Sequence, residues 1–493
     1  MITLIKSQYL LAYSPEQDNH ELISQGELAF EDHEIIYVGK AYSGHYDKLI
    51  DASDKLVAPG FVDLDALGDI DHTLLFYEHP AESRHELEWS QEYFKHERKE
   101  EMSAEDEAFK SLFAYVSLIR NGITTAMPIT SVMNKAAGET YAEIEAAAKH
   151  AAKLGLRVYL GPSYLAKKHV LDPESKSQIC LDLPPEELER GLADAEKFIK
   201  NYHNSAAGLI QAVVVPERIE LQTEDSLKRS KALARKYDLY FRLHAAQGKT
   251  DYSIITEKYG CSPIQYLDSI NLLDEKTLIP HCTYSSGCRT VEDRSNRDQE
   301  ILRQRGTTAI HCPLVYARFG AGLDSFGRFI REGVKMAMGT DTFPPDPFIV
   351  IRTGQATAKL LDQNRAENSL EQFYRAFTIG GADALGRKDL GRLAVGAKAD
   401  LIMIDLSRLE AGVIADPIQT LCLAANGGFV DSSIINGRIV MENREIPGID
   451  LAELKSRAQE YFQRMKHAYY KRSCARDQKS EAELFHKSFP EKA

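Results

Sequence analysis

From residue 60 to residue 385, stretches with helical periodicity alternate with short apolar runs. Four of the six predicted helices are closed by a glycine, at Gly122, Gly155, Gly306 and Gly333, and a β-prone run follows each helix. The predicted helix and strand pairs are 105–121 with 123–129, 143–154 with 157–160, 226–237 with 239–244, 264–272 with 277–281, 299–305 with 307–311, and 326–332 with 335–339. This alternation predicts parallel βαβ units. A doubly wound sheet gives a similar pattern.

Polar residues decide between these two folds in favour of a (β/α)₈ barrel. His244, His281 and His311 end predicted strands, and Asp341 follows another. The carboxyl ends of the strands carry the chemistry in parallel barrels. We therefore expect these side chains to line one end of a barrel.

The two ends of the chain have a different pattern. Residues 1–57 contain short β-prone runs, and strands return between 388 and 449, where Asn436-Gly437 predicts a two-residue hairpin. The predicted organisation is a small β-sandwich from residues 1–57 and 388–449, a barrel from 58–387, and a helical tail from 450–493. Apolar residues recur along that tail and predict one packed face: Leu451, Leu454, Ala458, Tyr461, Phe462 and Met465.

Composition and charge narrow the class of protein. The chain has 493 residues, 43% of them hydrophobic, which is enough to build a large core. A net charge of -13 argues against a general nucleic-acid surface. The first residues lack the pattern of a signal peptide, and no run of about 18 apolar residues predicts a membrane span. Seven scattered cysteines without a CxxC pair favour a reducing compartment, so we expect a cytoplasmic protein.

Five short motifs, in order along the chain, resemble the amidohydrolase superfamily. They are Leu56-Val57-Ala58-Pro59-Gly60-Phe61-Val62-Asp63, Leu243-His244-Ala245-Ala246-Gln247, His281-Cys282, His311-Cys312-Pro313 and Met338-Gly339-Thr340-Asp341. The stretch 390–401 resembles the return of the chain to the β-sandwich. The ordered set covers about residues 1–450 and is most similar to the branch of cytosine and guanine deaminases and triazine chlorohydrolases. The resemblance implies a barrel, a small heterocyclic substrate and a homo-oligomer.

The sequence departs from the family pattern at three places. The family's His-x-His, which holds the metal, is replaced by Asp65 and Leu67. The glutamate that shuttles protons is replaced by Gln247, which cannot exchange a proton at neutral pH. A further histidine is replaced by Tyr284. The metal site is therefore expected to be partly dismantled.

The resemblance nevertheless implies a set of metal ligands. His244 and His281 match two ligands, and Asp341 matches the aspartate that both ligates the metal and activates water. Asp65 is the expected replacement ligand, with Asp69, Asp71 or His72 as further candidates. Imidazole and carboxylate suit zinc, whereas additional carboxylates favour harder ions such as manganese or magnesium. We expect one divalent metal: zinc, manganese or iron.

A second set of residues is expected to contact the substrate. Gln247 can hydrogen-bond an amide, Tyr284 can donate to an oxyanion, and His311 can bind a carbonyl. Arg318 can clamp a carboxylate and Phe319 can stack on a ring. Cys282 and Cys312 also adjoin the site, which raises the hypothesis of a thiol nucleophile.

Three hypotheses for function follow. The first is hydrolysis of a C–N bond, or loss of another leaving group, on a small nitrogen heterocycle by metal-activated water. The second is metal-free hydrolase or lyase chemistry that uses Asp341 and His281 as an acid/base pair. The third is a non-catalytic protein that retained the barrel to bind a ligand.

Overall fold

The computed structural model describes residues 1–70, 85–97, 102–130, 135–172, 174–175, 177–323, 326–364 and 366–485. Its central sheet has eight parallel strands, and each pairs with the next one along the chain. The strands are β6 (Phe61–Leu67), β7 (Ile123–Ile129), β8 (Arg157–Leu160), β11 (Ile210–Val214), β12 (Tyr240–Arg242), β13 (Thr277–Pro280), β14 (Thr308–His311) and β15 (Lys335–Met338). The Asp341 amide, just beyond β15, donates to the Asp65 carbonyl in β6 at 2.8 Å, so the last strand meets the first. The predicted barrel is confirmed.

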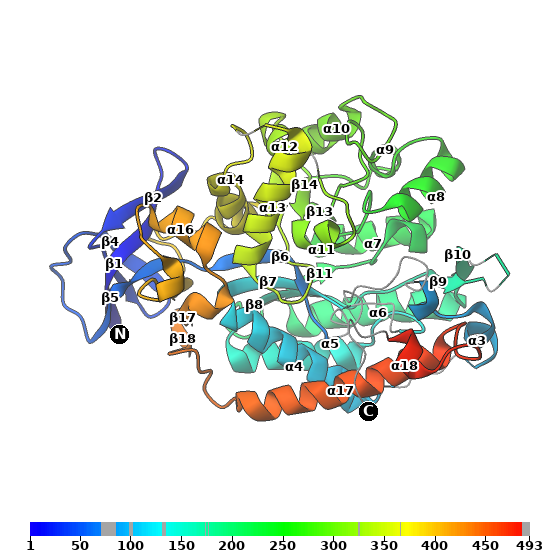
Figure 1. The fold of residues 1–493 in the computed structure, drawn as a ribbon, viewed down its shortest axis with the longest axis horizontal. Helices are drawn as coiled ribbons and strands as arrows, with labels where there is room; N and C mark the ends of the chain where they lie inside the picture. Colours follow the sequence, from blue (N-terminus) through cyan, green and yellow to red (C-terminus); the bar gives the residue numbers. More distant parts are fainter. Residues whose placement is uncertain are drawn as a thin grey trace.

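Helices cover the outside of this barrel (Figure 1). They are α4 (Ala104–Arg120), α5 (Tyr141–Leu154), α6 (Pro185–Tyr202), α7 (Glu224–Lys236), α8 (Lys249–Tyr259), α9 (Pro263–Ser269), α10 (Arg297–Arg305), α11 (Pro313–Arg318), α12 (Phe326–Arg331), α13 (Pro347–Asp362), α14 (Leu370–Arg375) and α15 (Gly381–Ala384), with a π-helical segment η3 (Ala376–Gly380). Helix α5 shows why the local sequence forms these boundaries. A capping box joins Thr140 to Glu143 at its start, and Gly155 ends it with a φ of 80°. Strand β11 and helix α6 were not predicted.

Shorter elements connect or flank the barrel units. They are the hairpin of β9 (Lys167–Leu171) and β10 (Gln178–Asp182), helix α3 (Gln91–His96), helix α16 (Pro417–Ala424), and the 3₁₀ turns η1 (His85–Leu87), η2 (Ile219–Leu221), η4 (Leu409–Ala411) and η5 (Gly427–Phe429). In the part of the chain that the structure describes, no helix combines the length and apolarity needed to cross a bilayer.

Both ends of the chain contribute to a second eight-stranded sheet beside the barrel (Figure 1). Its strands are β1 (Ile2–Ser14), β2 (Asn19–Ser24), β3 (Glu27–Glu31), β4 (Glu34–Gly39), β5 (Lys48–Pro59), β16 (Leu401–Asp405), β17 (Val430–Ile435) and β18 (Arg438–Met441). The antiparallel pairing of β5 with β16 joins the two ends. This pairing supports the division proposed above, with 1–57 and 388–449 in the β domain and 58–387 in the barrel.

The C-terminal tail forms helix α17 (Leu451–Arg472) and helix α18 (Glu481–Leu484). Helix α17 runs along the outside of the barrel next to α4 (Figure 1), and Tyr461 packs against Phe109 at 6.3 Å between ring centroids. Arg464 also pairs with Asp106 at the start of α4. The tail therefore buries the apolar face that its periodicity predicts.

A buried ion pair fastens the two domains together. Arg157, in β8, is 1% exposed, and its Nε and Nη2 each donate to an oxygen of Asp400 at 3.1 Å. Asp400 precedes β16, and its Oδ1 also accepts from the Asn436 amide at 2.6 Å in the β17–β18 turn. One carboxylate thus ties a barrel strand to the hairpin of the other domain.

We expect Arg157→Met to lower the free energy of unfolding by about 3–5 kcal/mol, because the substitution leaves the Asp400 carboxylate buried without its cation. Urea unfolding followed by circular dichroism measures the loss.

Arg229→Met is the matched control. Arg229 makes a two-pronged pair with Glu189 whose bonds, both at 2.7 Å, are shorter than those of Arg157, but this pair lies on the surface. Its loss should change stability by less than about 1 kcal/mol. Equal losses in the two variants would contradict a special role for the buried pair.

Candidate metal centre at the carboxyl end of the barrel

Four strands bring polar side chains to one end of the barrel. Asp65 lies near the end of β6, His244 and His281 follow β12 and β13, and Asp341 follows β15. Cys312 comes directly after β14. Because the strands are parallel, their carboxyl ends meet at one mouth, as the sequence predicted.

One group of ligand atoms forms there. Among the described residues, one oxygen each of Asp65 and Asp341, a nitrogen of His281 and the sulfur of Cys312 lie within 4.8 Å of one another, all buried. His281 Nε2 is 3.7 Å from Asp65 Oδ2 and 3.6 Å from Asp341 Oδ2. The Cys312 thiol donates to Asp65 Oδ2 at 3.5 Å. The group contains three of the four predicted ligands and adds a cysteine.

His244, the fourth predicted ligand, lies beside the other oxygen of Asp65. Its Nε2 is 3.7 Å from Asp65 Oδ1, and its ring stacks on that of His281 with centroids 5.4 Å apart. Its Nδ1 is 2.9 Å from the carbonyl oxygen of Glu217. A carbonyl can only accept a hydrogen bond, so Nδ1 carries a proton and Nε2 faces the site.

Arg242 is the residue of the site that the sequence reasoning missed. Its guanidinium is buried beneath the group, with Nη1 3.5 Å from Asp65 Oδ1 and donating to the Met127 carbonyl at 2.9 Å. The signal was its place two residues before His244, since alternate residues of a strand share a face. Arg242 thus puts a permanent positive charge inside the barrel.

A second aspartate holds the backbone of this site. Asp63 accepts hydrogen bonds from the Thr340 amide at 3.1 Å, the Thr340 hydroxyl at 2.6 Å and the Asp65 amide at 3.2 Å. Complete burial raises the pKa of Asp63 to about 7, against the effect of these three donors. Asp63 therefore links β6 to the residue before Asp341.

The charge states of the central groups follow from burial and neighbours. Burial alone would raise the pKa of Asp65, but the neighbouring His244 and Arg242 hold it well below its usual range. Burial holds the pKa of His281 well below its usual value, despite the opposing charge of Asp65. Asp65 is thus ionised and His281 neutral, the states in which carboxylate and imidazole bind metals.

These residues fit a divalent cation. Neither ring nitrogen of His281 has a hydrogen-bond partner, and neither does Asp65 Oδ1, although all three atoms are buried. Buried polar atoms without partners are rare in folded proteins and call for an explanation. A cation between the carboxylates and the imidazole would satisfy His281 Nε2 and the negative charge.

Gln247 lies next to this group and is held by a salt-bridged arginine. The Arg218 Nη1 donates to Gln247 Oε1, and the Arg218 Nε donates to Glu217 Oε1 at 3.1 Å. The hydroxyl of Tyr316 donates to the Gln247 carbonyl, and its ring meets His281 edge-on at 5.1 Å. Because Arg218 uses the amide oxygen, the amide NH₂ of Gln247 remains as a donor.

The other predicted substrate contacts lie around the mouth or behind it. Tyr284 is half-buried and packs near Tyr252, with centroids 6.2 Å apart, and Phe319 is 39% exposed. Arg318 donates to the Thr342 hydroxyl at 2.7 Å, close to Asp341 in the chain. His311 is buried near Phe326 and Phe373 under the outer helices, and burial lowers its pKa to about 3. Their roles stay predictions.

The remaining candidates are placed as follows. Asp69 is buried but is not one of the four grouped residues, and Asp71 and His72 lie outside the described residues. Burial raises the pKa of the Cys282 and Cys312 thiols well above the usual value, which disfavours a thiolate nucleophile. The seven cysteines all lie among the described residues, and none of them forms a disulfide.

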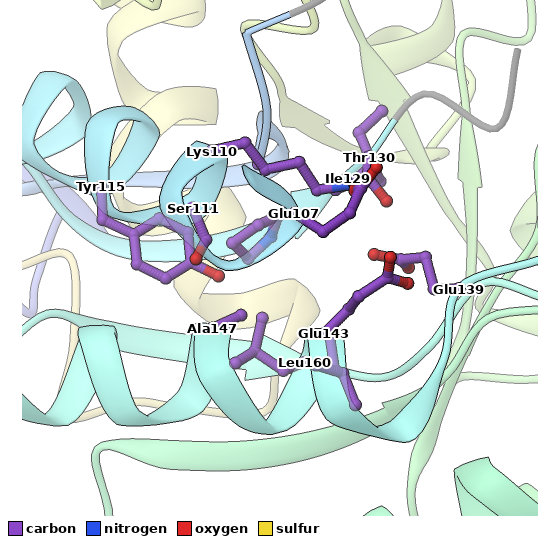
Figure 2. A pocket seen from close by; sticks show the side chains of 13 residues that line it. Glu107, Lys110, Ser111, Tyr115, Ile129, Thr130, Glu139, Glu143, Ala147 and Leu160 are labelled. Carbon is purple, nitrogen blue, oxygen red and sulfur yellow. Dashed lines mark ion pairs between the residues drawn. The ribbon is translucent and has the colours of Figure 1, made fainter. Parts of the chain in front are cut away.

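A separate charged cluster lies between α4 and α5, outside the barrel strands. Figure 2 shows Glu107 and Lys110 of α4 facing Glu139 and Glu143 around a cavity of about 20 Å³, room for one water. Lys110 Nζ is 2.5 Å from Glu107 Oε2, and Lys135 pairs with Glu107 at 3.1 Å and also with Glu143. The paired charges of this cluster hold two helices together. The cavity between them is too small to take a heterocycle.

The model of the amidohydrolase family matches residues 56–440. The chain belongs to this family. The match begins at the strand that leads into the barrel and ends within the last hairpin of the β domain, so it contains every grouped ligand. The resemblance to the deaminase and chlorohydrolase branch is confirmed by the relatives.

Two of the proteins that are similar to this chain in sequence are deaminases. The 5-methylthioadenosine/S-adenosylhomocysteine deaminase of Pyrococcus abyssi is 27% identical over 436 residues, covering 87% of this chain and 92% of its own. The 5'-deoxyadenosine deaminase of Methanosarcina mazei is 25% identical over 464 residues, covering 92% and 96%.

Two solved structures share the fold at 18% identity. The zinc-bound adenosine deaminase of Xanthomonas campestris has a TM-score of 0.76 and covers 94% of this chain and 98% of its own. The zinc complex of atrazine chlorohydrolase from Arthrobacter aurescens has a TM-score of 0.77, with coverage of 93% and 100%.

We expect Arg242→Met to lower the unfolding free energy of the metal-free protein by about 3–5 kcal/mol, since buried Asp65 loses its cation. Excess Zn²⁺ should recover part of that loss, because a bound divalent ion replaces the missing positive charge and stabilises the folded state. Urea unfolding with and without Zn²⁺ measures both effects.

Arg318→Met serves as the control, because Arg318 is exposed and donates to a neutral hydroxyl. Its effect should be about 0.5 kcal/mol or less. If zinc stabilises the Arg242 variant no more than the wild type, Arg242 does not supply charge to the metal centre.

Proposed function

We propose that this amidohydrolase-family protein hydrolyses a C–N bond of a small nitrogen heterocycle with the help of one divalent cation. The convergence of Asp65, His281 and Asp341 from three strands into one buried group carries this proposal. Hydrolysis at such a site needs a carboxylate that can accept a proton from water and a neutral imidazole beside it. Both are present.

The relatives indicate the kind of bond. Those named above are deaminases of adenosine-type nucleosides, and they are similar over most of both chains. Loss of ammonia from an aminopurine ring is therefore the first reaction to test. Loss of another leaving group from a related ring, as in the chlorohydrolase, is the second reaction to test.

The chain supplies defined groups for this chemistry. Asp341 is placed to accept the proton of the attacking water, and neutral His281 lies 3.6 Å from it. A divalent cation, when bound by Asp65, His281 and Asp341, supplies Lewis-acid polarisation that brings the pKa of water to about 7. His244 faces Oδ1, the other oxygen of the same carboxylate, and the family resemblance rather than this grouping implies it as a ligand.

Gln247 differs from the family's glutamate in what it can do. It presents N–H groups but moves no proton, so it can orient a ring oxygen or nitrogen that accepts a hydrogen bond. Proton transfer to the leaving group then falls to Asp341 or His281. Tyr284, His311, Arg318 and Phe319 are the proposed further contacts with the substrate.

Ligand binding without turnover is the second candidate function. The observation that favours it is the contact of Gln247 with Arg218, which fixes a non-titratable side chain where the family has an acid/base. Metal-free catalysis by Asp341 and His281 is a variant of the first function, and a chelator separates the two.

We also propose a homo-oligomer in a reducing, cytoplasmic setting. Seven cysteines that form no disulfide support the compartment. The oligomer is implied by the family resemblance, and light scattering of the purified protein tests it.

We expect Asp341→Asn to lower kcat/KM at least about a thousandfold, because the variant can neither accept the proton of water nor provide the same negative charge to the cation. Ammonia release from adenosine-type nucleosides, guanine and aminotriazines is the measurement. Exhaustive chelation should abolish the same activity, and added Zn²⁺ should restore it.

Asp182→Asn removes a carboxylate that is 81% exposed on β10 and should leave the rate unchanged. Full activity of Asp341→Asn would refute the proposed role of that residue. Activity that survives chelation would favour the metal-free mechanism, and tight ligand binding with no product would favour the binding protein.

We expect Gln247→Glu to raise kcat, because a carboxyl group there can carry a proton, and one general acid or base contributes about 10²- to 10⁴-fold. The measurement is kcat of Gln247→Glu, compared with kcat of the wild type and of Gln247→Ala. The alanine variant tests the loss of the side chain alone. A lower kcat in the glutamate variant would mean that the amide is adapted to the substrate.

A further inference from the structure

The two oxygens of Asp65 face different surroundings. Oδ1 faces the Arg242 guanidinium at 3.5 Å and His244 Nε2 at 3.7 Å. Oδ2 faces His281 Nε2 at 3.7 Å and the Cys312 sulfur at 3.5 Å. Oδ1 of the carboxylate therefore faces a permanently charged guanidinium, whereas Oδ2 faces an uncharged imidazole and an uncharged thiol.

Arg242 makes the Oδ1 side unfavourable for a metal ion. Its guanidinium is 1% exposed, keeps its charge, and is fixed by its bond to the Met127 carbonyl. A divalent ion at Oδ1 would lie within a few ångströms of this like charge, where little water screens the repulsion. The ion is better placed at Oδ2.

The Oδ2 side contains Cys312. Its side chain is completely buried, and its sulfur belongs to the group whose ligand atoms lie within 4.8 Å of one another. His281 is also completely buried, and its unpartnered Nε2 faces the same region, 3.7 Å from Asp65 Oδ2. Leu67 occupies the place of a family ligand and cannot bind a metal, so the set lacks a donor that a sulfur can supply.

We propose that Cys312 is a metal ligand, so that the cation is held by Asp65 Oδ2, His281 Nε2, Asp341 Oδ2 and the Cys312 sulfur. Binding replaces the S–H bond by a bond between sulfur and metal, and the proton goes to solvent. A mixed set of four nitrogen, oxygen and sulfur ligands suits zinc, whereas thiolate disfavours magnesium and manganese. Zinc is thus favoured over manganese and magnesium.

The assignment shares its cation with the proposed function but is tested without substrate. Co²⁺ is added to metal-free protein, and the near-ultraviolet charge-transfer band from thiolate to cobalt is recorded. We expect this band in the wild type and its loss in Cys312→Ser, with Zn²⁺ affinity lowered more than about tenfold.

Cys282→Ser is the matched control. Cys282 is equally buried and lies at the same end of the barrel, directly after His281, but its sulfur contacts the Ile279 carbonyl at 3.8 Å and is outside the group. This variant should keep the band. A band that persists in Cys312→Ser, or wild-type protein that binds Co²⁺ without a band or binds none, would overturn the assignment.

X-ray absorption of zinc-loaded wild-type protein tests the same assignment without a variant, so its result does not depend on whether Cys312→Ser folds. One sulfur at about 2.3 Å supports Cys312 as a ligand, whereas nitrogen and oxygen alone at about 2.0–2.2 Å overturn it. A sulfur-ligated zinc without heterocycle hydrolysis would leave the assignment intact and remove the proposed function. Heterocycle hydrolysis by a protein whose zinc has only nitrogen and oxygen ligands would support the proposed function and overturn Cys312 as a ligand.

Discussion

The buried carboxylate of Asp65 is the constraint around which the barrel end is organised. Its backbone carbonyl accepts from the Asp341 amide and brings the last strand against the first. Its side chain is 0% exposed, and an ionised group at such a place costs several kcal/mol unless its surroundings compensate. The compensation comes from Arg242 and His244, and a cation bound beside His281 would add to it. Gly339 permits this closeness, since a Cβ there would come within 2.5 Å of the Asp65 Cβ.

The site has changed its charge rather than lost its chemistry. Where the family has two imidazoles, this chain has one carboxylate and a leucine, which adds a negative charge. The buried Arg242 offsets that charge permanently, and Asp63, with its pKa raised to about 7, adds only part of another. Arg242 and one divalent cation would together come close to neutralising Asp65, Asp341 and the thiolate proposed for Cys312. This balance is a physical reason for one metal ion rather than two.

The backbone at the strand ends supports the same arrangement. Ala246, His281, Cys282 and Asp341 all have positive φ values, between 39° and 73°. Residues other than glycine adopt this region at a cost of about 1–3 kcal/mol, and such residues cluster at functional sites. Here the turns aim His281 and Asp341 at each other, and the packed barrel beneath them maintains the strain.

The sequence determined the fold and most of the chemical inventory. Helical and strand periods predicted the barrel units between α4 and β15. The ordered motifs indicated His244, His281, Asp341 and Asp65 as candidates. These residues were expected to lie together because the carboxyl ends of parallel strands meet at one end of a barrel. The tertiary structure decided what those residues meet. Strand β11 was missed because the period of a short apolar run does not distinguish a strand from a buried helix. Arg242 looked like an ordinary strand residue until the closed barrel buried it against Asp65, 177 positions earlier in the chain. Likewise, Cys312 became a candidate ligand only because closure of the sheet brings the end of β14 within 3.5 Å of Asp65 in β6, a proximity that no local pattern predicts.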